Sequence, residues 1–160
     1  MRRRARECAL QILYQLDVQS EMEQGRLSPE QVRAAIERYW ESFETVSPEE
    51  KAFAERLAEG VASSVADLDQ AIGAVSHHWK MSRMDKVDRN LIRLAAYEIL
   101  HCPDIPRSVS INEALEIAGR YGGGDSVPFI NGILDQLGRD RADAEGSPAA
   151  EPPPDDGGES

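Results

Sequence analysis

The sequence has few of the residues that mark several large classes of protein. It contains only two cysteines, Cys8 and Cys102, which have no CxxC spacing. This excludes a disulfide framework and fits a reducing, cytoplasmic environment. Its three histidines have no spacing typical of metal ligands. No apolar run approaches the roughly 18 residues of a membrane-spanning helix, and the start is too polar for a signal peptide.

Sequence motifs for enzymatic chemistry are also missing. The run Gly122–Gly124 has no preceding strand and no following Lys-Ser or Lys-Thr, so it is interpreted as a linker between helices and not as a phosphate loop. Acidic residues lie mostly at helix starts or on polar faces, and no pair stands out as a general acid and base. The sequence therefore predicts no catalytic residue, no metal site and no cofactor.

Apolar residues recur with the period of an α-helix in every patterned segment, and no segment alternates like a β-strand. Ser28 and Ser47 are each followed by proline and by a Gln or Glu at the third position, which is the pattern of a capping box. The long stripe after Ser47 is expected to break near Asp67 or Asp69. These features predict an all-α fold of about seven helices.

Three further helices complete this expectation. The segment from Met84 to Leu100 is apolar around most of its circumference, as in a helix packed on several sides. Ser110 is expected to cap the next helix, and Asp125 or Ser126 to cap the last one, which follows the glycine linker. Residues 142–160 are rich in acid and proline and contain no Lys or Arg. We expect a folded unit at 1–141 and a disordered acidic tail at 142–160.

Four arginines, Arg2, Arg3, Arg4 and Arg6, lie in the first six residues of a chain with a net charge of −11. A cation in the first turn of a helix opposes the helix dipole, at a cost of about 0.3–1 kcal/mol each when exposed. Helix-start arginines that point outwards suit the phosphate groups of a nucleic acid. The alternative is a solvated basic end without a ligand.

An aromatic residue lies just after the glycine linker. On a helical wheel, Phe129 is about 90° from the centre of the apolar stripe of the last helix, so it is expected at the margin of the buried face. Its ring could stack on an unpaired base, while Asp125 and Ser126 contact base edges or ribose. A packing role, in which the ring closes the glycine loop onto the core, explains the same position.

Four stretches of the chain resemble the NusB family of bacterial transcription antitermination factors, in the family's order and spacing from about residue 2 to residue 138. They are RRRARECALQILYQLD, DKVDRNLIRLAAYEIL, IPRSVSINEALEIAGRYG and SVPFINGILDQL. The resemblance implies two small helical bundles that bind the boxA element of ribosomal RNA leader transcripts. It also implies a ribosomal partner, the small-subunit protein called NusE in this role, within the RNA polymerase antitermination complex.

The resemblance assigns RNA binding to residues at two places and partner binding to two others. Tyr14 and Asp88 are implied to meet NusE, with Asp88 expected as an exposed acid facing a basic protein. Pro128 departs from the family pattern, because relatives often carry a basic residue there. The implied RNA-binding residues are Arg2, Arg3, Arg4, Arg6, Asp125, Ser126 and Phe129.

Two other interpretations compete with an RNA-binding adaptor. One is the RNA-positioning domain of a ribosomal RNA cytosine methyltransferase, which carries a similar helical domain. Such an enzyme needs a nucleophilic cysteine, usually after a proline, whereas Cys102 comes before Pro103. The other is a structural homodimer that uses the RNA or partner surface to pair with itself.

Overall fold

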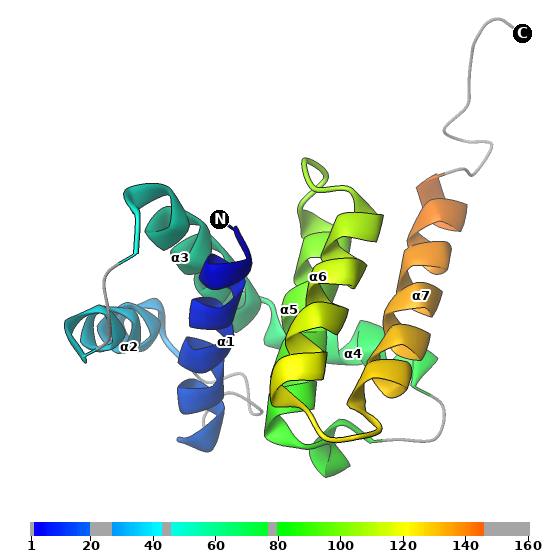
Figure 1. Cartoon of the computed structure of the whole chain (residues 1–160), viewed down its shortest axis with the longest axis horizontal. Coiled ribbons are helices and arrows are strands. Elements are labelled where there is room, and N and C mark those ends of the chain that lie inside the picture. The colour runs from blue at the N-terminus through cyan, green and yellow to red at the C-terminus, as the bar shows by residue number, and fades with distance from the viewer. Residues whose placement is uncertain (1, 20–26, 43–45, 77–79, 146–160) are drawn as a thin grey trace, which may run out of the picture.

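The chain folds into helices joined by short connections (Figure 1). The computed structural model describes residues 2–19, 27–42, 46–76 and 80–145. Over these residues it contains seven α-helices and one 3-10 turn and has no strand, which confirms the all-α prediction. None of the described helices is long and apolar enough to cross a membrane. The helices are α1 (Arg2–Val18), α2 (Pro29–Ser42), α3 (Pro48–Ser63), α4 (Val65–Val75), α5 (Lys86–His101), α6 (Arg107–Tyr121) and α7 (Ser126–Glu145), with the 3-10 turn η2 at Met81–Arg83.

The helices form two groups around α5. Helices α1, α2 and α3 pack together on one side, and α4, α6 and α7 lie on the other (Figure 1). Helix α5 contacts α1 and α3 of the first group and all three helices of the second. Its buried residues therefore lie between the two groups, which explains why the segment is apolar around most of its circumference.

Two helix starts follow the predicted capping chemistry. The Ser28 hydroxyl accepts a hydrogen bond from the Gln31 backbone N–H, and the Gln31 side chain accepts one from the Ser28 backbone N–H. Ser47 and Glu50 form the same reciprocal pair at the start of α3. Each box satisfies two backbone donors that the helix leaves without an intrahelical partner.

Three predicted boundaries differ in the structure. The long stripe after Ser47 breaks at Ser64, between α3 and α4, and not at an aspartate. Helix α6 begins at Arg107, directly after Pro106, so Ser110 lies inside its first turn and is not a cap. Helix α7 begins at Ser126, one of the two residues expected to cap it, and it continues to Glu145, past the expected start of the tail. Residues 146–160 lie outside the described residues.

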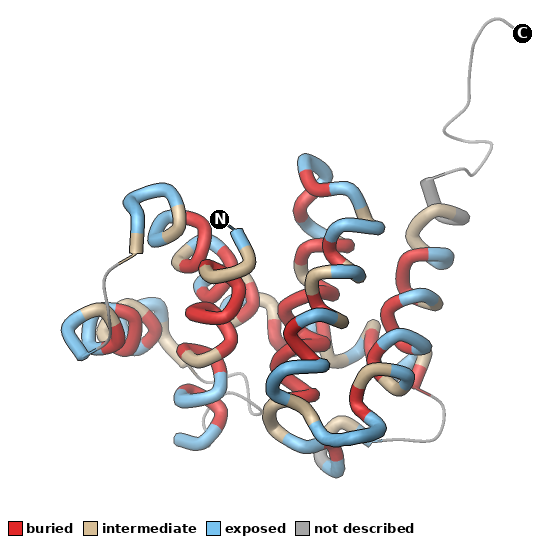
Figure 2. The backbone as a smooth tube through the Cα atoms, in the orientation of Figure 1, coloured by how far each residue is buried: buried red, intermediate tan, exposed pale blue. Residues whose placement is uncertain are grey.

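The core consists of the inward faces of all seven helices (Figure 2). A buried polar network on α5 ties the two groups together. One carboxylate oxygen of Asp17, on α1, accepts hydrogen bonds from Arg89, Asn90 and Arg93 of α5. The Arg93 guanidinium also forms a two-bond fork with Asp69 of α4, at 2.8 Å for each bond. This network fixes α5 relative to α1 and α4, and with it the start of α5, which lines the site described next.

Candidate nucleic-acid interface

A hollow of about 350 Å³ lies where the α6–α7 turn meets the start of α5. The predicted residues Asp125, Ser126 and Phe129 all line it, so the structure brings this part of the predicted site together. Phe129 is half-buried and packs partly against the core while also lining the hollow. Its ring therefore has the packing role and also borders a space next to polar groups. The other lining residues are Arg83, Met84, Asp85, Asp88, Gly123 and Gly124.

Gly122 lets the chain turn closely into this hollow. A Cβ atom at Gly122 would lie 2.6 Å from the Ser126 side chain and 2.8 Å from the Ala118 carbonyl oxygen. At Gly123 and Gly124, an added Cβ would meet nothing within 4 Å. The absence of a side chain at Gly122 therefore permits Ser126 to pack closely against the end of α6.

Asp88 is buried at the wall of this hollow, which corrects the expectation of an exposed acid. It is 9% exposed, and the Ser126 hydroxyl lies 2.9 and 3.0 Å from its two carboxylate oxygens. Burial raises the pKa of the Asp88 carboxyl. The negative charge of the nearby Asp85 also raises it, whereas the hydrogen bond from Ser126 lowers it. The neighbouring residue Val87 lines a different hollow, so adjacent side chains at the start of α5 face two separate surfaces.

The expectation that all four arginines point outwards is wrong for Arg6. Its side chain is 3% exposed and forms a two-bond fork with Glu98, with both bonds at 2.8 Å. The Ser110 hydroxyl donates a third hydrogen bond to Glu98, at 2.7 Å. The Arg6 guanidinium is thus almost fully buried and is already paired with a carboxylate.

The other three arginines are more exposed but already contact groups of the protein. Arg2 is exposed, and its guanidinium carbon lies 4.2 Å from the centre of the Phe53 ring. Arg3 forms a two-bond fork with Glu113 of α6, at 2.9 Å for each bond. The hydrogen bond from Arg3 lowers the pKa of the Glu113 carboxyl. Internal partners therefore offset part of the helix-dipole cost that the arginines impose on the first turn of α1.

Arg2, Arg3 and Arg6 line a hollow of about 550 Å³ between the starts of α1 and α6. Asp104 and Glu113 line the same space. Arg56 of α3 donates two hydrogen bonds to the Asp104 carboxylate, at 2.8 and 3.1 Å, and these lower the pKa of that carboxyl. Both signs of charge are present, so this end of the molecule is not a purely basic patch.

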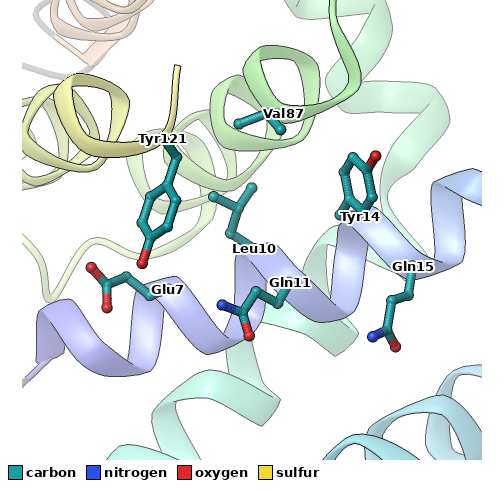
Figure 3. A pocket seen from close by; sticks show the side chains of 7 residues that line it. All are labelled: Glu7, Leu10, Gln11, Tyr14, Gln15, Val87 and Tyr121. Atoms are coloured by element: carbon teal, nitrogen blue, oxygen red, sulfur yellow. The ribbon is translucent and has the colours of Figure 1, made fainter. Parts of the chain in front are cut away.

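Tyr14 borders a third hollow, of about 370 Å³, between α1, the start of α5 and the end of α6 (Figure 3). Tyr14 and Tyr121 are 40% and 44% exposed. Leu10 and Val87 lie between the two tyrosines and provide apolar surface (Figure 3). An exposed apolar hollow with tyrosine edges is typical of a protein-binding surface.

Sequence reasoning missed several residues of these surfaces. Glu7, Glu98 and Glu113 hold the arginines of α1 in place, and Arg120 contacts Glu7 at 2.7 Å. Glu98 and Glu113 gave no signal, because their arginine partners lie 92 and 110 residues away in the chain. Glu7 contacts Arg4 only three residues away, but its contact with Arg120 spans 113 residues. Arg120 had one signal, since it is a cation in the last turn of a helix directly before the glycine linker.

Comparisons with known proteins agree with this architecture. The family model described as "NusB family" matches residues 3–139. The chain is 46% identical over 136 residues to the transcription antitermination protein NusB of Anaeromyxobacter dehalogenans, covering 85% of this chain and 89% of that protein. It is 40% identical over 151 residues to the NusB protein of a Geobacter species, covering 90% of this chain and 98% of the relative.

Solved structures show the same fold. The structure of T. maritima NusB matches with a TM-score of 0.73 at 33% identity, covering 91% of this chain and 95% of that one. A second match is a chain from the crystal structure of the antitermination factors NusB and NusE in complex with double-stranded RNA. Its TM-score is 0.66 at 20% identity, and the match covers 88% of this chain and 98% of that chain. The second similarity shows the shared fold.

Proposed function

The chain belongs to the NusB family, and we propose that it binds the boxA element of ribosomal RNA leader transcripts together with the ribosomal protein NusE. Family membership makes it a transcription antitermination factor and not an enzyme. The observation that carries the proposal is the match over residues 3–139, because this range contains every proposed contact residue except Arg2. The NusB–NusE complex with RNA, a neighbour in fold, supports the same kind of assembly.

The geometry supports two RNA-binding places, one for phosphate groups and one for a base. At the start of α1, Arg2, Arg3 and Arg4 supply positive charge for phosphates. At the start of α7, the ring of Phe129 supplies a stacking surface, and Asp125 supplies hydrogen-bond acceptors at the edge of the same hollow. We leave Arg6 out of the phosphate contacts, because it is buried with Glu98.

The hollow beside Tyr14 is the proposed NusE surface. It is apolar and exposed, and it lies apart from the hollow that contains Phe129. Asp88 lines the Phe129 hollow instead, so we propose that it acts there by holding Ser126 in place. Association with the RNA polymerase complex and formation of a homodimer stay predictions.

Titration of boxA RNA at several salt concentrations, with and without NusE, tests the proposal. Arg4→Ala is expected to flatten the salt dependence by about 0.7 in log–log slope, as for one lost phosphate contact on a single strand. Phe129→Ala is expected to cost about 1–3 kcal/mol of RNA binding and to keep the wild-type slope, because stacking releases no counterions. Tyr14→Ala is the matched control, expected to weaken the NusE complex while RNA affinity without NusE is unchanged. Wild-type protein that prefers boxA no more than a scrambled RNA would refute the proposal.

A further inference from the structure

A single carboxylate on α1 is shared by two guanidinium groups. The Glu7 side chain is only 6% exposed, and its two oxygens face Arg4 at 3.3 Å and Arg120 at 2.7 Å. The side chain of Arg120 is 54% exposed, against 31% for that of Arg4. Glu7 thus sits beneath the surface and holds two cations at the surface.

The charge balance around Arg120 differs from that around the other arginines of this face. Arg3 faces two carboxylates, Glu113 at 2.9 Å and Glu116 at 3.9 Å. Arg6 has Glu98 to itself in the interior. Among the described residues, the carboxylate paired with Arg120 is that of Glu7, which is also paired with Arg4. One negative charge is thus shared by two cations, so the positive charge of Arg120 is only partly neutralised.

Arg120 also has hydrogen-bond donors left to offer. A guanidinium has five N–H donors, and the contact to Glu7 uses Nη1. Within the described part of the chain, the Nε and Nη2 groups of Arg120 have no hydrogen-bond partner. Binding a phosphate therefore does not require Arg120 to give up Glu7, and the ion pair holds the side chain in place for a ligand.

The position of Arg120 connects the two proposed RNA-binding places. Glu113, which is paired with Arg3, and Arg120 are seven residues apart on α6, which is about 10 Å along a helix. Arg120 lies in the last turn of α6, two residues before Gly122, where the chain turns towards the hollow with Phe129. Along α6, Arg120 therefore lies between the Arg3–Glu113 pair and the turn that leads to the Phe129 hollow. Pro128, directly before Phe129, has no charge to add on the α7 side of the turn.

We propose that Arg120 is a phosphate-binding residue that carries the RNA backbone from the arginines of α1 to the Phe129 hollow. This inference rests on the proposed function, because the ligand is the same RNA. It adds a contact that lies outside the arginine-rich start and outside the last helix. Glu7 is the positioning residue for this contact.

The test compares three full-length variants by boxA RNA titration with NusE present, from about 50 to 200 mM salt. Arg120→Ala is expected to reduce the log–log slope by about 0.7, so that over this fourfold range wild type loses about 2–3-fold more affinity than the variant. Arg120→Lys keeps the charge and is expected to keep the slope. Arg139→Ala is the matched control, because Arg139 is an exposed arginine on α7 paired with Asp135 at 2.8 Å, and its slope is expected to equal that of wild type.

The outcomes separate the inference from the proposed function. If folded Arg120→Ala has the same salt slope as the wild-type protein, the inference is overturned. The proposed function still stands in that case, provided that the wild-type protein binds boxA RNA. A loss confined to NusE affinity, measured without RNA, would also overturn it, since Arg120 lies next to Tyr121 of the proposed partner hollow. If wild type itself shows no preference for boxA, the proposed function fails and this inference fails with it. The unfolding midpoint of each variant is measured as well, so that lower RNA affinity is distinguished from a smaller folded fraction.

Discussion

Replacing Arg6 with alanine removes one half of a buried ion pair, and we expect it to destabilise the protein strongly. Arg6 and Glu98 are 3% and 1% exposed, and each bond of their fork is 2.8 Å long. Among the described residues, alanine would leave the Glu98 carboxylate in the interior with the Ser110 hydroxyl as its one remaining side-chain donor. A carboxylate in a site of low polarity needs a compensating positive charge, so the loss is much larger than that of a surface contact.

The size of the effect follows from burial. Removing one partner of a buried pair costs about 3–5 kcal/mol, which is a large part of the roughly 5–15 kcal/mol that stabilises a typical domain. For a protein of this length, each kcal/mol lowers the melting temperature by about 2–4 °C. The expected drop for Arg6→Ala is therefore about 6–20 °C.

Urea unfolding followed by circular dichroism measures this cost, with Arg3→Ala as the matched control. Arg3 forms the same two-bond fork with Glu113, but the two side chains are 38% and 22% exposed. The control is expected to lose no more than about 1 kcal/mol, because solvent screens a surface pair. A variant with both Arg6→Met and Glu98→Leu is expected to recover part of the loss. If Arg6→Ala unfolds within about 0.5 kcal/mol of wild type, the guanidinium does not stabilise the fold as its burial implies.

Two further predictions concern the wall of the Phe129 hollow. Ser126→Ala removes the hydroxyl that donates to Asp88. We expect the free energy of unfolding, measured in urea, to fall by about 1–3 kcal/mol, and the pKa of the Asp88 carboxyl, measured by NMR titration, to rise. An unchanged pKa would contradict the hydrogen bond. Gly122→Ala places a Cβ 2.6 Å from the Ser126 side chain, so we expect a loss of about 1–3 kcal/mol, whereas Gly123→Ala meets nothing within 4 Å and should unfold like wild type. Equal stability of the two glycine variants would refute the close-approach argument.

The helices could be predicted from the sequence because their signals are local. The reciprocal capping pairs at Ser28 and Ser47 involve residues three positions apart, and the structure forms both. The break at Ser64 was misplaced because the apolar stripe runs through it, with Val61 and Val65 buried on either side. No proline or glycine marks this position. Periodicity predicts which face of a helix is buried. Here the apolar period continues across the break, so it does not mark the end of α3.

The pairing of the polar residues could not be predicted, because it depends on tertiary packing. Arg6 and Glu98 are 92 residues apart, and Asp88 and Ser126 are 38 apart. One signal was nevertheless present. With 100° per residue, Arg6 lies about 20° from Leu13 on a helical wheel, within the apolar stripe of α1. A charged residue on a buried face predicts a buried partner, although it does not identify which of the many acids supplies it.

The arginine-rich start of α1 is therefore not one functional unit, although it has that appearance in the sequence. Arg6 stabilises the fold, whereas Arg3 and Arg4 lie nearer the surface with carboxylates beside them. If a variant that removes all the arginines at once loses the proposed RNA binding, the cause is either unfolding or the loss of phosphate contacts. Single substitutions distinguish the two causes, because a lost phosphate contact changes the salt slope and a lost buried pair changes the free energy of unfolding. The number of cations in a segment is thus a weaker guide to phosphate binding than the carboxylates packed against each one.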